Sequence, residues 1–205
     1  MFRNGKRILC ALAAMTLISA PAWADILLPA PKTSSGMGVF SALNSRHSAK
    51  HGEFPLKEIS RAELSNLLWA ASGKNRFGKG WTVPFAMGKA PYNTIYVLDN
   101  SGVFKYNWKD NGLVEISKQD VREKAGPQPI VGQSPVVLVF VAESGTKPDI
   151  AYIASGAMTQ NIYLAAESLA IEGRYVISMD ETQLRDALKL KPDEKLLNLM
   201  LIGKK

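Results

Sequence analysis

The feature that most constrains the fold is the run at residues 135–142 (PVVLVFVA), in which every residue after the proline is apolar. The run is too short to cross a bilayer, and four of its residues are β-branched valines. A continuous apolar run of this length is typical of a central strand that is buried on both faces. A sheet with such a strand needs a layer of structure on each side. We therefore expect a sheet that is covered by helices.

Helical signals occur on both sides of this run in the sequence. Residues 60–63 (SRAE) have the form of a capping box, in which the Ser60 hydroxyl caps the helix start and Glu63 reaches back. Apolar residues at helical spacing continue to Gly73, which is expected to end this helix. The same criteria predict the other helices at residues 37–45, 149–172 and 180–190.

Strand signals lie between the helices. Alternating residues at 94–98 and 103–106 surround residues 99–102 (DNSG), and this pattern predicts a hairpin. Further strands are expected at residues 113–116, 175–179 and 196–202, and loops at residues 74–80 and 126–134. Helices come first, then a strand meander, then alternating strands and helices. This order predicts an α/β sandwich with a mixed sheet.

Residues 1–24 have the pattern of a secretory signal peptide. Three basic residues precede the apolar residues 8–20, and residues 22–24 (AWA) offer the small–x–small site that signal peptidase cleaves. We expect cleavage after Ala24, an extended arm at residues 25–36 and one domain at residues 37–205, in a periplasmic or secreted protein. The alternative is a buried N-terminal helix, but Pro21 and the order of the charges favour export.

Cleavage at this site changes the chemistry that the chain can carry. It removes three basic residues, so the net charge falls from +7 to +4, and the remaining cations are dispersed. A nucleic-acid partner is therefore not expected. Cys10, the single cysteine, is removed as well, so the mature chain has no disulfide, thiolate metal ligand or cysteine nucleophile. No other segment is long and apolar enough to be a membrane span.

The two histidines, His47 and His51, lie together in residues 46–51 (RHSAKH). A hydrolase triad is not expected, because the chain has no G-x-S-x-G elbow. A metal site is not expected, because the cationic neighbours would repel a metal ion. Arg46, Ser48 and Lys50 instead offer a bidentate fork, a hydroxyl and a point charge, which suit a phosphate group. The alternative is a solvated basic turn.

Further motifs follow this segment in a characteristic order. They are LLWAASG at 67–73, KGWTVPFA at 79–86, IYV at 95–97, GVFKY at 102–106, PVVL at 135–138, QNIYLAA at 160–166 and a last strand that ends near Lys204. Together with residues 46–50, these motifs resemble the nitroreductase-like FMN-dependent oxidoreductases. The branch that includes thiazole- and oxazole-forming peptide dehydrogenases is the most similar. The resemblance covers residues 37–204.

This resemblance implies a three-layer α/β sandwich with a mixed, mostly antiparallel sheet, and a homodimer that binds FMN at the subunit interface. It also implies transfer of hydride or electrons through the flavin to a small organic or peptide acceptor. Arg46, His47, Ser48 and Lys50 match the family segment that holds the FMN phosphate and ribityl chain, and Lys204 is the candidate for a basic residue after the last strand. No catalytic side chain is assigned, because the flavin supplies the chemistry.

Residues 84–91 (PFAMGKAP) depart from the family pattern beside the flavin ring. Phe85 replaces a serine, and no Asn or Gln follows before Asn93, so the ring edge would lose polar partners. We expect Phe85 and Ala86 near the ring; in the alternative, Phe85 and Met87 fill a gap in the core. Because of these departures, a flavin-free binding or structural dimer is the second candidate function.

The helix expected at residues 149–172 departs from the family pattern as well. An acidic residue that the family often has near Ala154 or Ser155 is absent. Tyr152, Met158 and Tyr163 lie at helical spacing, and we expect them in the core or at a dimer interface rather than at a cofactor.

Export also bears on the electron donor. The N-terminal residues do not form a twin-arginine signal, so the chain is expected to cross the membrane unfolded and to acquire FMN outside the cytoplasm. Free NAD(P)H is not expected to be plentiful there. We therefore expect a different reductant.

Overall fold

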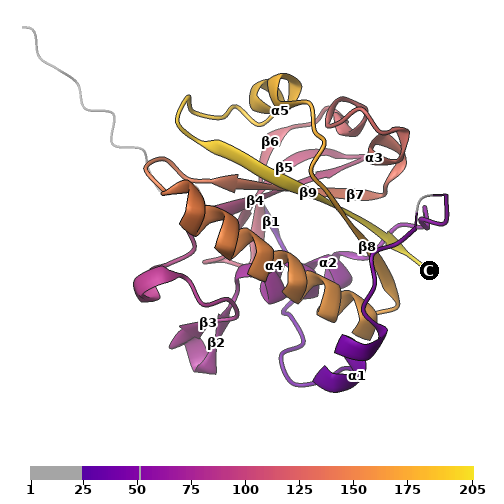
Figure 1. Cartoon of the computed structure of the whole chain (residues 1–205), viewed down its shortest axis with the longest axis vertical. Helices are drawn as coiled ribbons and strands as arrows, with labels where there is room; N and C mark the ends of the chain where they lie inside the picture. The colour runs from indigo at the N-terminus through magenta and orange to yellow at the C-terminus, as the bar shows by residue number, and fades with distance from the viewer. Residues whose placement is uncertain (1–24, 51) are drawn as a thin grey trace, which may run out of the picture.

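The computed structural model describes residues 25–50 and 52–205 (Figure 1). The predicted signal peptide at residues 1–24 lies outside the described residues, so its cleavage stays a prediction. The described chain forms a seven-stranded sheet in the order β1-β6-β5-β4-β7-β9-β8, and every pairing in that sheet is antiparallel. Its strands are β1 (Ile26–Leu27), β4 (Asn93–Asp99), β5 (Gly102–Asn107), β6 (Gly112–Ser117), β7 (Val136–Ala142), β8 (Ile171–Val176) and β9 (Lys195–Lys204).

The strand β7 lies inside the sheet, as the apolar run at residues 135–142 predicts. All seven residues of β7 are buried, and β4 and β9 pair with its two edges. The predicted hairpin is confirmed as well, because β4 and β5 pair up to Asp99 and Gly102. Each face of this sheet is apolar, so each face must be covered to be kept from water.

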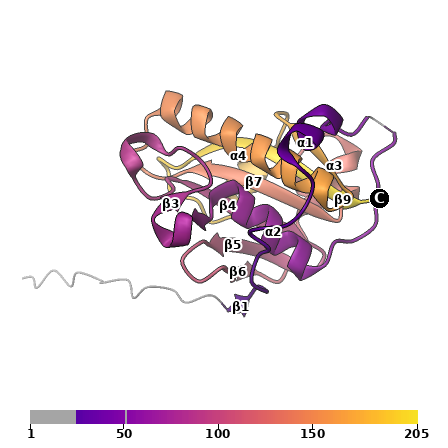
Figure 2. The ribbon, with the colours of Figure 1, turned by 90° about the horizontal axis from the view of Figure 1, so that it is seen from below.

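Helices cover both faces, which confirms the three-layer sandwich. On one face lie α2 (Arg61–Ser72) and α4 (Pro148–Ser168), with α1 (Val39–Ser45) packed beside α4 (Figure 2). On the other face lie the short helices α3 (Pro129–Gln133) and α5 (Glu181–Ala187) (Figure 1). Each face has its own buried apolar cluster, one around α2 and α4 and the other around α5. Among the described residues, no helix is both long and apolar enough to cross a membrane.

The capping box predicted at residues 60–63 is present. The Ser60 hydroxyl accepts a hydrogen bond from the Glu63 backbone N–H at 3.2 Å, and the Glu63 carboxylate accepts one from the Ser60 N–H at 2.7 Å. The helix ends at Gly73, also as predicted. The Glu63 carboxylate in addition accepts from the Lys204 ammonium, so the start of α2 is tied to the end of β9.

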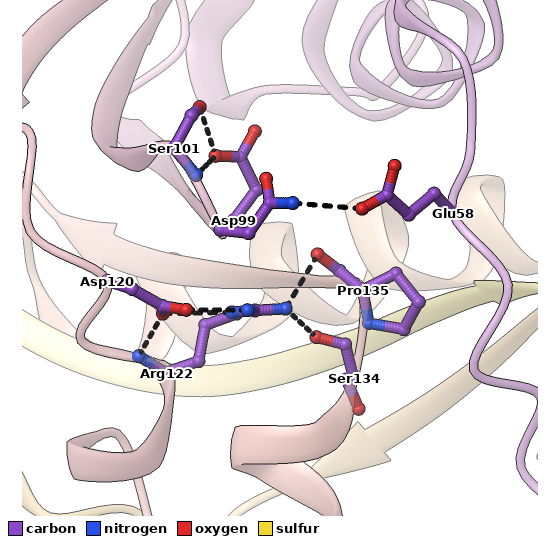
Figure 3. Close-up of polar contacts among 8 residues, drawn as sticks. Glu58, Asp99, Ser101, Asp120, Arg122, Ser134 and Pro135 are labelled. Atoms are coloured by element: carbon purple, nitrogen blue, oxygen red, sulfur yellow. Dashed lines mark hydrogen bonds and ion pairs between the residues drawn. The ribbon is translucent and has the colours of Figure 1, made fainter.

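Polar contacts fix the loops at one end of the sheet (Figure 3). The Asp99 carboxylate accepts from the Ser101 N–H at 2.8 Å and so closes the β4–β5 turn. Arg122, in the short 3-10 helix η3 (Arg122–Lys124), pairs with Asp120 and donates to the Ser134 carbonyl at 2.8 Å. This second contact holds the backbone immediately before β7, so the entry of the inner strand is fixed by a charged group.

The prediction of one helix at residues 149–172 is wrong at its end. The helix α4 ends at Ser168, and residues 171–176 form β8 instead of a strand at 175–179. Ala170 takes a left-handed conformation with φ of 53°, and Ile171 is then buried opposite Lys204. Pairing with β9 therefore overrides the helical pattern of this stretch. As a result Gly173, expected as a helix end, lies within the strand.

The predicted loops also contain short regular elements. Residues 74–80 were expected as a loop, but β2 (Lys74–Asn75) and β3 (Gly80–Trp81) pair as a small hairpin around η1 (Arg76–Gly78). Residues 126–134 contain α3. The arm at residues 25–36 is extended, and its strand β1 adds to the sheet beside β6. Such short elements depend on tertiary contacts rather than on a periodic sequence pattern.

A substitution at Gly203 in β9 can test how tightly the backbone at Pro55, before α2, packs on the sheet. A Cβ atom at this position would lie 2.0 Å from the Pro55 carbonyl oxygen, and backbone cannot yield as a flexible side chain does. We expect Gly203→Ala to lower the free energy of unfolding by about 1–3 kcal/mol, measured by urea denaturation. Gly38→Ala is the matched control, because a Cβ there meets nothing within 4 Å. Equal stability of the two variants would contradict this packing.

Candidate functional site

Residues 46–50 form an anchored surface segment, here called the cationic segment. It follows α1 and runs against the edge strand β8. The Ala49 N–H donates to the Gly173 carbonyl at 3.0 Å, and Arg174 Nη1 donates to the Ala49 carbonyl at 3.0 Å. Ala49 is buried, whereas Ser48 and Lys50 are exposed. The backbone is therefore fixed while the polar side chains on both sides of Ala49 face outward.

Tyr163 of α4 supports the outward-facing side chains. The guanidinium carbon of Arg46 lies 5.3 Å from the centre of the Tyr163 ring, a cation–π distance. The Tyr163 hydroxyl accepts from the Tyr175 N–H at 2.8 Å and donates to Ser48 Oγ at 3.0 Å. The Ser48 hydroxyl proton is then left to donate to another group. Tyr163 is buried as predicted, but sequence reasoning missed that it carries the site.

Arg46 keeps its hydrogen-bond donors. Within residues 25–50 and 52–205, no carboxylate or carbonyl oxygen pairs with its guanidinium. A guanidinium with free donors beside a hydroxyl with a free proton can bind an anion with oxygens on several sides, such as a phosphate monoester. The geometry thus favours the anion-site interpretation over the solvated basic turn.

His47 points the other way, toward two carboxylates. Its Nδ1 lies 3.0 Å from the Ser45 carbonyl oxygen and 3.3 Å from Glu167 Oε1, and its Nε2 lies 3.1 Å from a Glu172 carboxylate oxygen. The side chains of Glu167 and Glu172 are each only 10% exposed. The sequence predicted His47 as a phosphate ligand. In the structure both of its ring nitrogens contact oxygen atoms of the protein instead.

The cations at the end of the chain are paired as well. The Lys204 ammonium, a predicted phosphate ligand, pairs with Glu63. Lys205 takes the position next to the cationic segment, where its Nζ lies 2.8 Å from Glu172 Oε1. The structure therefore gives His47 and Lys204 carboxylate partners, and leaves Arg46, Ser48 and Lys50 as the predicted ligands that face outward.

These pairs shift the acidities of the groups. The hydrogen bond to the Ser45 carbonyl and the charges of Glu172 and Glu167 raise the pKa of His47 above its usual 6.5, although partial burial opposes them. Hydrogen bonding to Glu172 likewise raises the pKa of Lys205. Burial acts against ionisation of Glu63, but hydrogen bonds from Lys204 and Ser60 lower the pKa of its carboxyl group overall.

Phe85 and Ala86 lie in a different part of the domain. Phe85 is 5% exposed and meets the rings of Trp81 and Tyr92 edge to face, at centroid distances of 6.3 and 5.2 Å. Phe85 thus packs in the core, as the alternative interpretation has it. Met87 does not fill the core, since it is 83% exposed. The Ala86 N–H is already used, because it donates to the Tyr92 hydroxyl at 3.2 Å.

A hollow of about 470 Å³ lies beside this aromatic group. Its wall combines apolar side chains with the loop that precedes α4, and the lining includes Ala86, Met87, Tyr92, Gly145 and Ile150. A hollow of this size and character suits a flat, largely apolar ligand rather than a small ion.

One copy of the chain does not bring the predicted residues into one site. The hollow adjoins Ile150 in the first turn of α4, whereas the cationic segment contacts Tyr163 and Glu167 near the end of that helix. Thirteen residues of helix between Ile150 and Tyr163 correspond to about 20 Å. Figure 1 shows α4 as the long orange helix whose ends mark these two regions.

Comparisons with known proteins agree on one family. The sequence profile of the nitroreductase family matches residues 43–204. A protein of Methanocaldococcus jannaschii that is assigned to the nitroreductases is 28% identical over 170 residues, which cover 75% of this chain and 85% of the relative.

Solved structures give the same result. A crystal structure from Ralstonia eutropha JMP134, also assigned to the nitroreductases, is 32% identical with a TM-score of 0.78, over 87% of this chain and 88% of that chain. A chain of the Escherichia coli microcin synthetase McbBCD complex is 16% identical with a TM-score of 0.65, over 93% of this chain and 85% of that chain. This second likeness concerns the fold.

The pKa of His47 provides a direct test of the site geometry. A group whose pKa is raised on folding stabilises the fold in full below its unfolded value of about 6.5 and loses this contribution as the pH rises through the folded value. We expect the imidazole protons of His47 to titrate above pH 6.5 in an NMR experiment. In Glu167→Gln the midpoint should fall. A midpoint at or below 6.5 in the unaltered protein would mean that the carboxylates do not face the ring.

Proposed function

Because the chain belongs to the nitroreductase family, we propose that it is an exported, FMN-dependent oxidoreductase that passes hydride or electrons through the flavin to a small organic or peptide acceptor. Family membership supports oxidoreductase activity in general, and members of the family typically use FMN. The flavin would supply the redox chemistry, while the protein binds it, orients it and excludes water.

The observation that carries the proposal is the pair of free donors at the cationic segment. The Arg46 fork and the Ser48 hydroxyl face outward on one support, the Tyr163 side chain. Lys50 adds an exposed positive charge on the same segment. A phosphate monoester needs this combination of charge and directed donors. The residues present therefore fit the phosphate end of FMN, with Arg46, Ser48 and Lys50 as its ligands.

The hollow near Ala86 fits the other end of FMN. The apolar part of its lining suits the faces of an isoalloxazine ring, while the exposed Lys89, Lys147 and Glu143 put charges of both signs on its wall. Few neutral polar side chains face the ring edge, as the departures at residues 84–91 predict. Binding would then depend on the phosphate end and on ring packing more than on hydrogen bonds to the ring edge.

The separation of these two ends supports a homodimer. They lie near opposite ends of α4, and a flavin shared by the hollow of one copy and the cationic segment of a second copy would not have to span this helix. Large apolar side chains on the outer surface support such an assembly: Phe40 on α1 is 83% exposed and Ile153 on α4 is 74% exposed. On α1 the neighbouring Val39 and Leu43 are exposed as well, and several apolar side chains exposed together are typical of protein interfaces.

Two further parts of the proposal rest on the sequence. The pattern of residues 1–24 supports export to the periplasm or the medium. If the protein acts there, its electron donor is a reductant other than free NAD(P)H. Export is tested by the N-terminal residue and the compartment of the purified protein.

The second candidate function is a flavin-free binding or structural dimer. One observation favours it: Phe85 fills its own aromatic corner, and the Ala86 N–H is already bonded to Tyr92. A colourless preparation that stays colourless after incubation with excess FMN would support this candidate. A yellow protein with the absorption bands of bound flavin would exclude it.

Replacing Arg46 tests the phosphate site. We expect Arg46→Ala to weaken FMN binding by about ten- to a hundredfold, since it removes a charge-assisted pair worth roughly 1.5–3 kcal/mol. The binding of riboflavin, which has no phosphate, should change little. Flavin fluorescence during titration measures both.

Lys118→Ala is the matched control for charge, because Lys118 is exposed and lies in the sequence just after β6. It should leave the affinity for FMN unchanged. If Arg46→Ala binds FMN as tightly as this control does, the phosphate assignment is wrong.

Mixing two variants tests the shared site. Arg46→Ala disables the phosphate end, and Ala86→Trp should block the hollow. If each flavin lies between the hollow of one copy and the cationic segment of the other, a heterodimer of the two variants has one doubly altered site and one intact site. We expect the refolded mixture to contain sites that bind FMN with the affinity of the unaltered protein, which neither variant shows alone. No recovery in a mixture that forms heterodimers would mean that the flavin does not lie between the hollow of one copy and the cationic segment of the other.

A further inference from the structure

We propose that His47 is a positioning residue rather than a phosphate ligand, and that it holds the cationic segment against Glu167 and Glu172 so that Arg46 and Ser48 face the anion. We call the side chains of His47, Glu167 and Glu172 the carboxylate clamp. The proposal rests on the proposed function for the identity of the anion. The clamp itself is defined by contacts within the described residues.

The ring of His47 has no donor left for a phosphate. An imidazole has two nitrogens, and each can carry one hydrogen. Here Nδ1 faces the Ser45 carbonyl at 3.0 Å and Glu167 at 3.3 Å, while Nε2 faces Glu172 at 3.1 Å. All of these partners accept hydrogen bonds, so the ring can donate to both carboxylates at once only in its protonated, positively charged form. Both ring nitrogens therefore face groups of the protein.

The two carboxylates are fixed points for this contact. Glu167 belongs to the last turn of α4, and Glu172 lies in β8, where its carboxylate also binds Lys205. Both side chains are only 10% exposed, whereas that of His47 is 48% exposed. The rigid core therefore positions the segment, rather than the reverse. With the Ala49 backbone bonded to Gly173 on the other side, His47 and Ala49 hold the segment on both sides of Ser48.

The charges around His47 allow two roles of this residue to be distinguished: direct binding of the phosphate, and positioning of the cationic segment. The charged groups that face it or its segment are Glu167 on α4, Glu172 and Arg174 on β8, Lys205 at the chain end, and Arg46 and Lys50 on the segment itself. A carboxylate near an anion site repels the anion. If His47 bound phosphate directly, neutralising Glu167 would strengthen FMN binding. If His47 positions the segment, the same change would weaken binding, because the clamp loses the negative charge that attracts the imidazolium.

The proposal predicts a pH dependence with a definite sign. His47 holds both carboxylates only when it is protonated, so the clamp is complete below the pKa of His47 and is lost as the pH rises through it. His47→Arg keeps a charged group with several donors at all of these pH values. FMN itself ionises identically with either protein. The affinity of the unaltered protein relative to His47→Arg should therefore fall as the pH rises.

The first experiment compares three variants by flavin fluorescence, with riboflavin as the ligand that lacks phosphate. We expect His47→Leu and Glu167→Gln each to bind FMN about tenfold more weakly, the effect of losing one charged hydrogen bond. Riboflavin binding should not change, and His47→Arg should retain the affinity for FMN. If Glu167→Gln binds FMN as tightly as the unaltered protein, or more tightly, His47 is not a positioning residue.

The second experiment needs no flavin. Hydrogen–deuterium exchange of the protein without ligand reports the Ala49 amide, which donates to Gly173 in the clamped segment. We expect faster exchange at residues 46–50 in His47→Leu and Glu167→Gln, protection in His47→Arg, and no change in β7. Unchanged exchange in the first two variants would overturn the clamp. Failure of the unaltered protein to bind FMN would overturn the proposed function alone, because the exchange measurement still tests the clamp.

Discussion

The burial of the Glu172 carboxylate is the constraint on which the candidate site depends. A charge in a strand with a side chain only 10% exposed is costly unless it is paired, and the pairs come from His47 and Lys205, far apart in the sequence. The same interaction therefore joins the segment after the first helix to the end of the chain. The cationic segment is held beside Tyr163 as a result, and its remaining donors face outward. The pairing of the buried Glu172 with His47 thus fixes residues 46–50, which form the candidate site.

The long helix α4 has a second role, which is to set a distance. Its first turn adjoins the hollow near Ala86, and its last turns support the cationic segment. A helix of this length is rigid, so the two half-sites cannot approach each other within one copy. Our proposal therefore places the flavin between two copies of the chain. In this view the exposed apolar residues of α1 and α4 belong to the functional site as much as the polar ligands do.

The two half-sites differ in chemistry, and this difference bears on selectivity. At the cationic segment, directed donors and positive charge can distinguish a phosphate from other groups. At the hollow, Phe85 packs against Trp81 and Tyr92, and the backbone donor of Ala86 is already used. Packing of this kind tolerates a range of flat ligands. Recognition of a flavin would then come from its phosphate, whereas the hollow would admit acceptors of various shapes.

The sequence by itself determined the layers of the fold, because periodicity and capping are local signals. The apolar run at residues 135–142 predicted the inner strand, and residues 60–63 predicted the start of α2. The phosphate site at residues 46–50 rests on their residue types together with the family resemblance, and it stays a prediction. Only the tertiary structure decided the end of α4, since the pairing of Ile171 with β9 is a contact between distant residues. The tertiary structure also determines which way each side chain of residues 46–50 points. Arg46 and Ser48 face outward, while His47 contacts Glu167 and Glu172. A sequence shows which charges a segment carries, but the direction of each side chain depends on partners that only folding brings near.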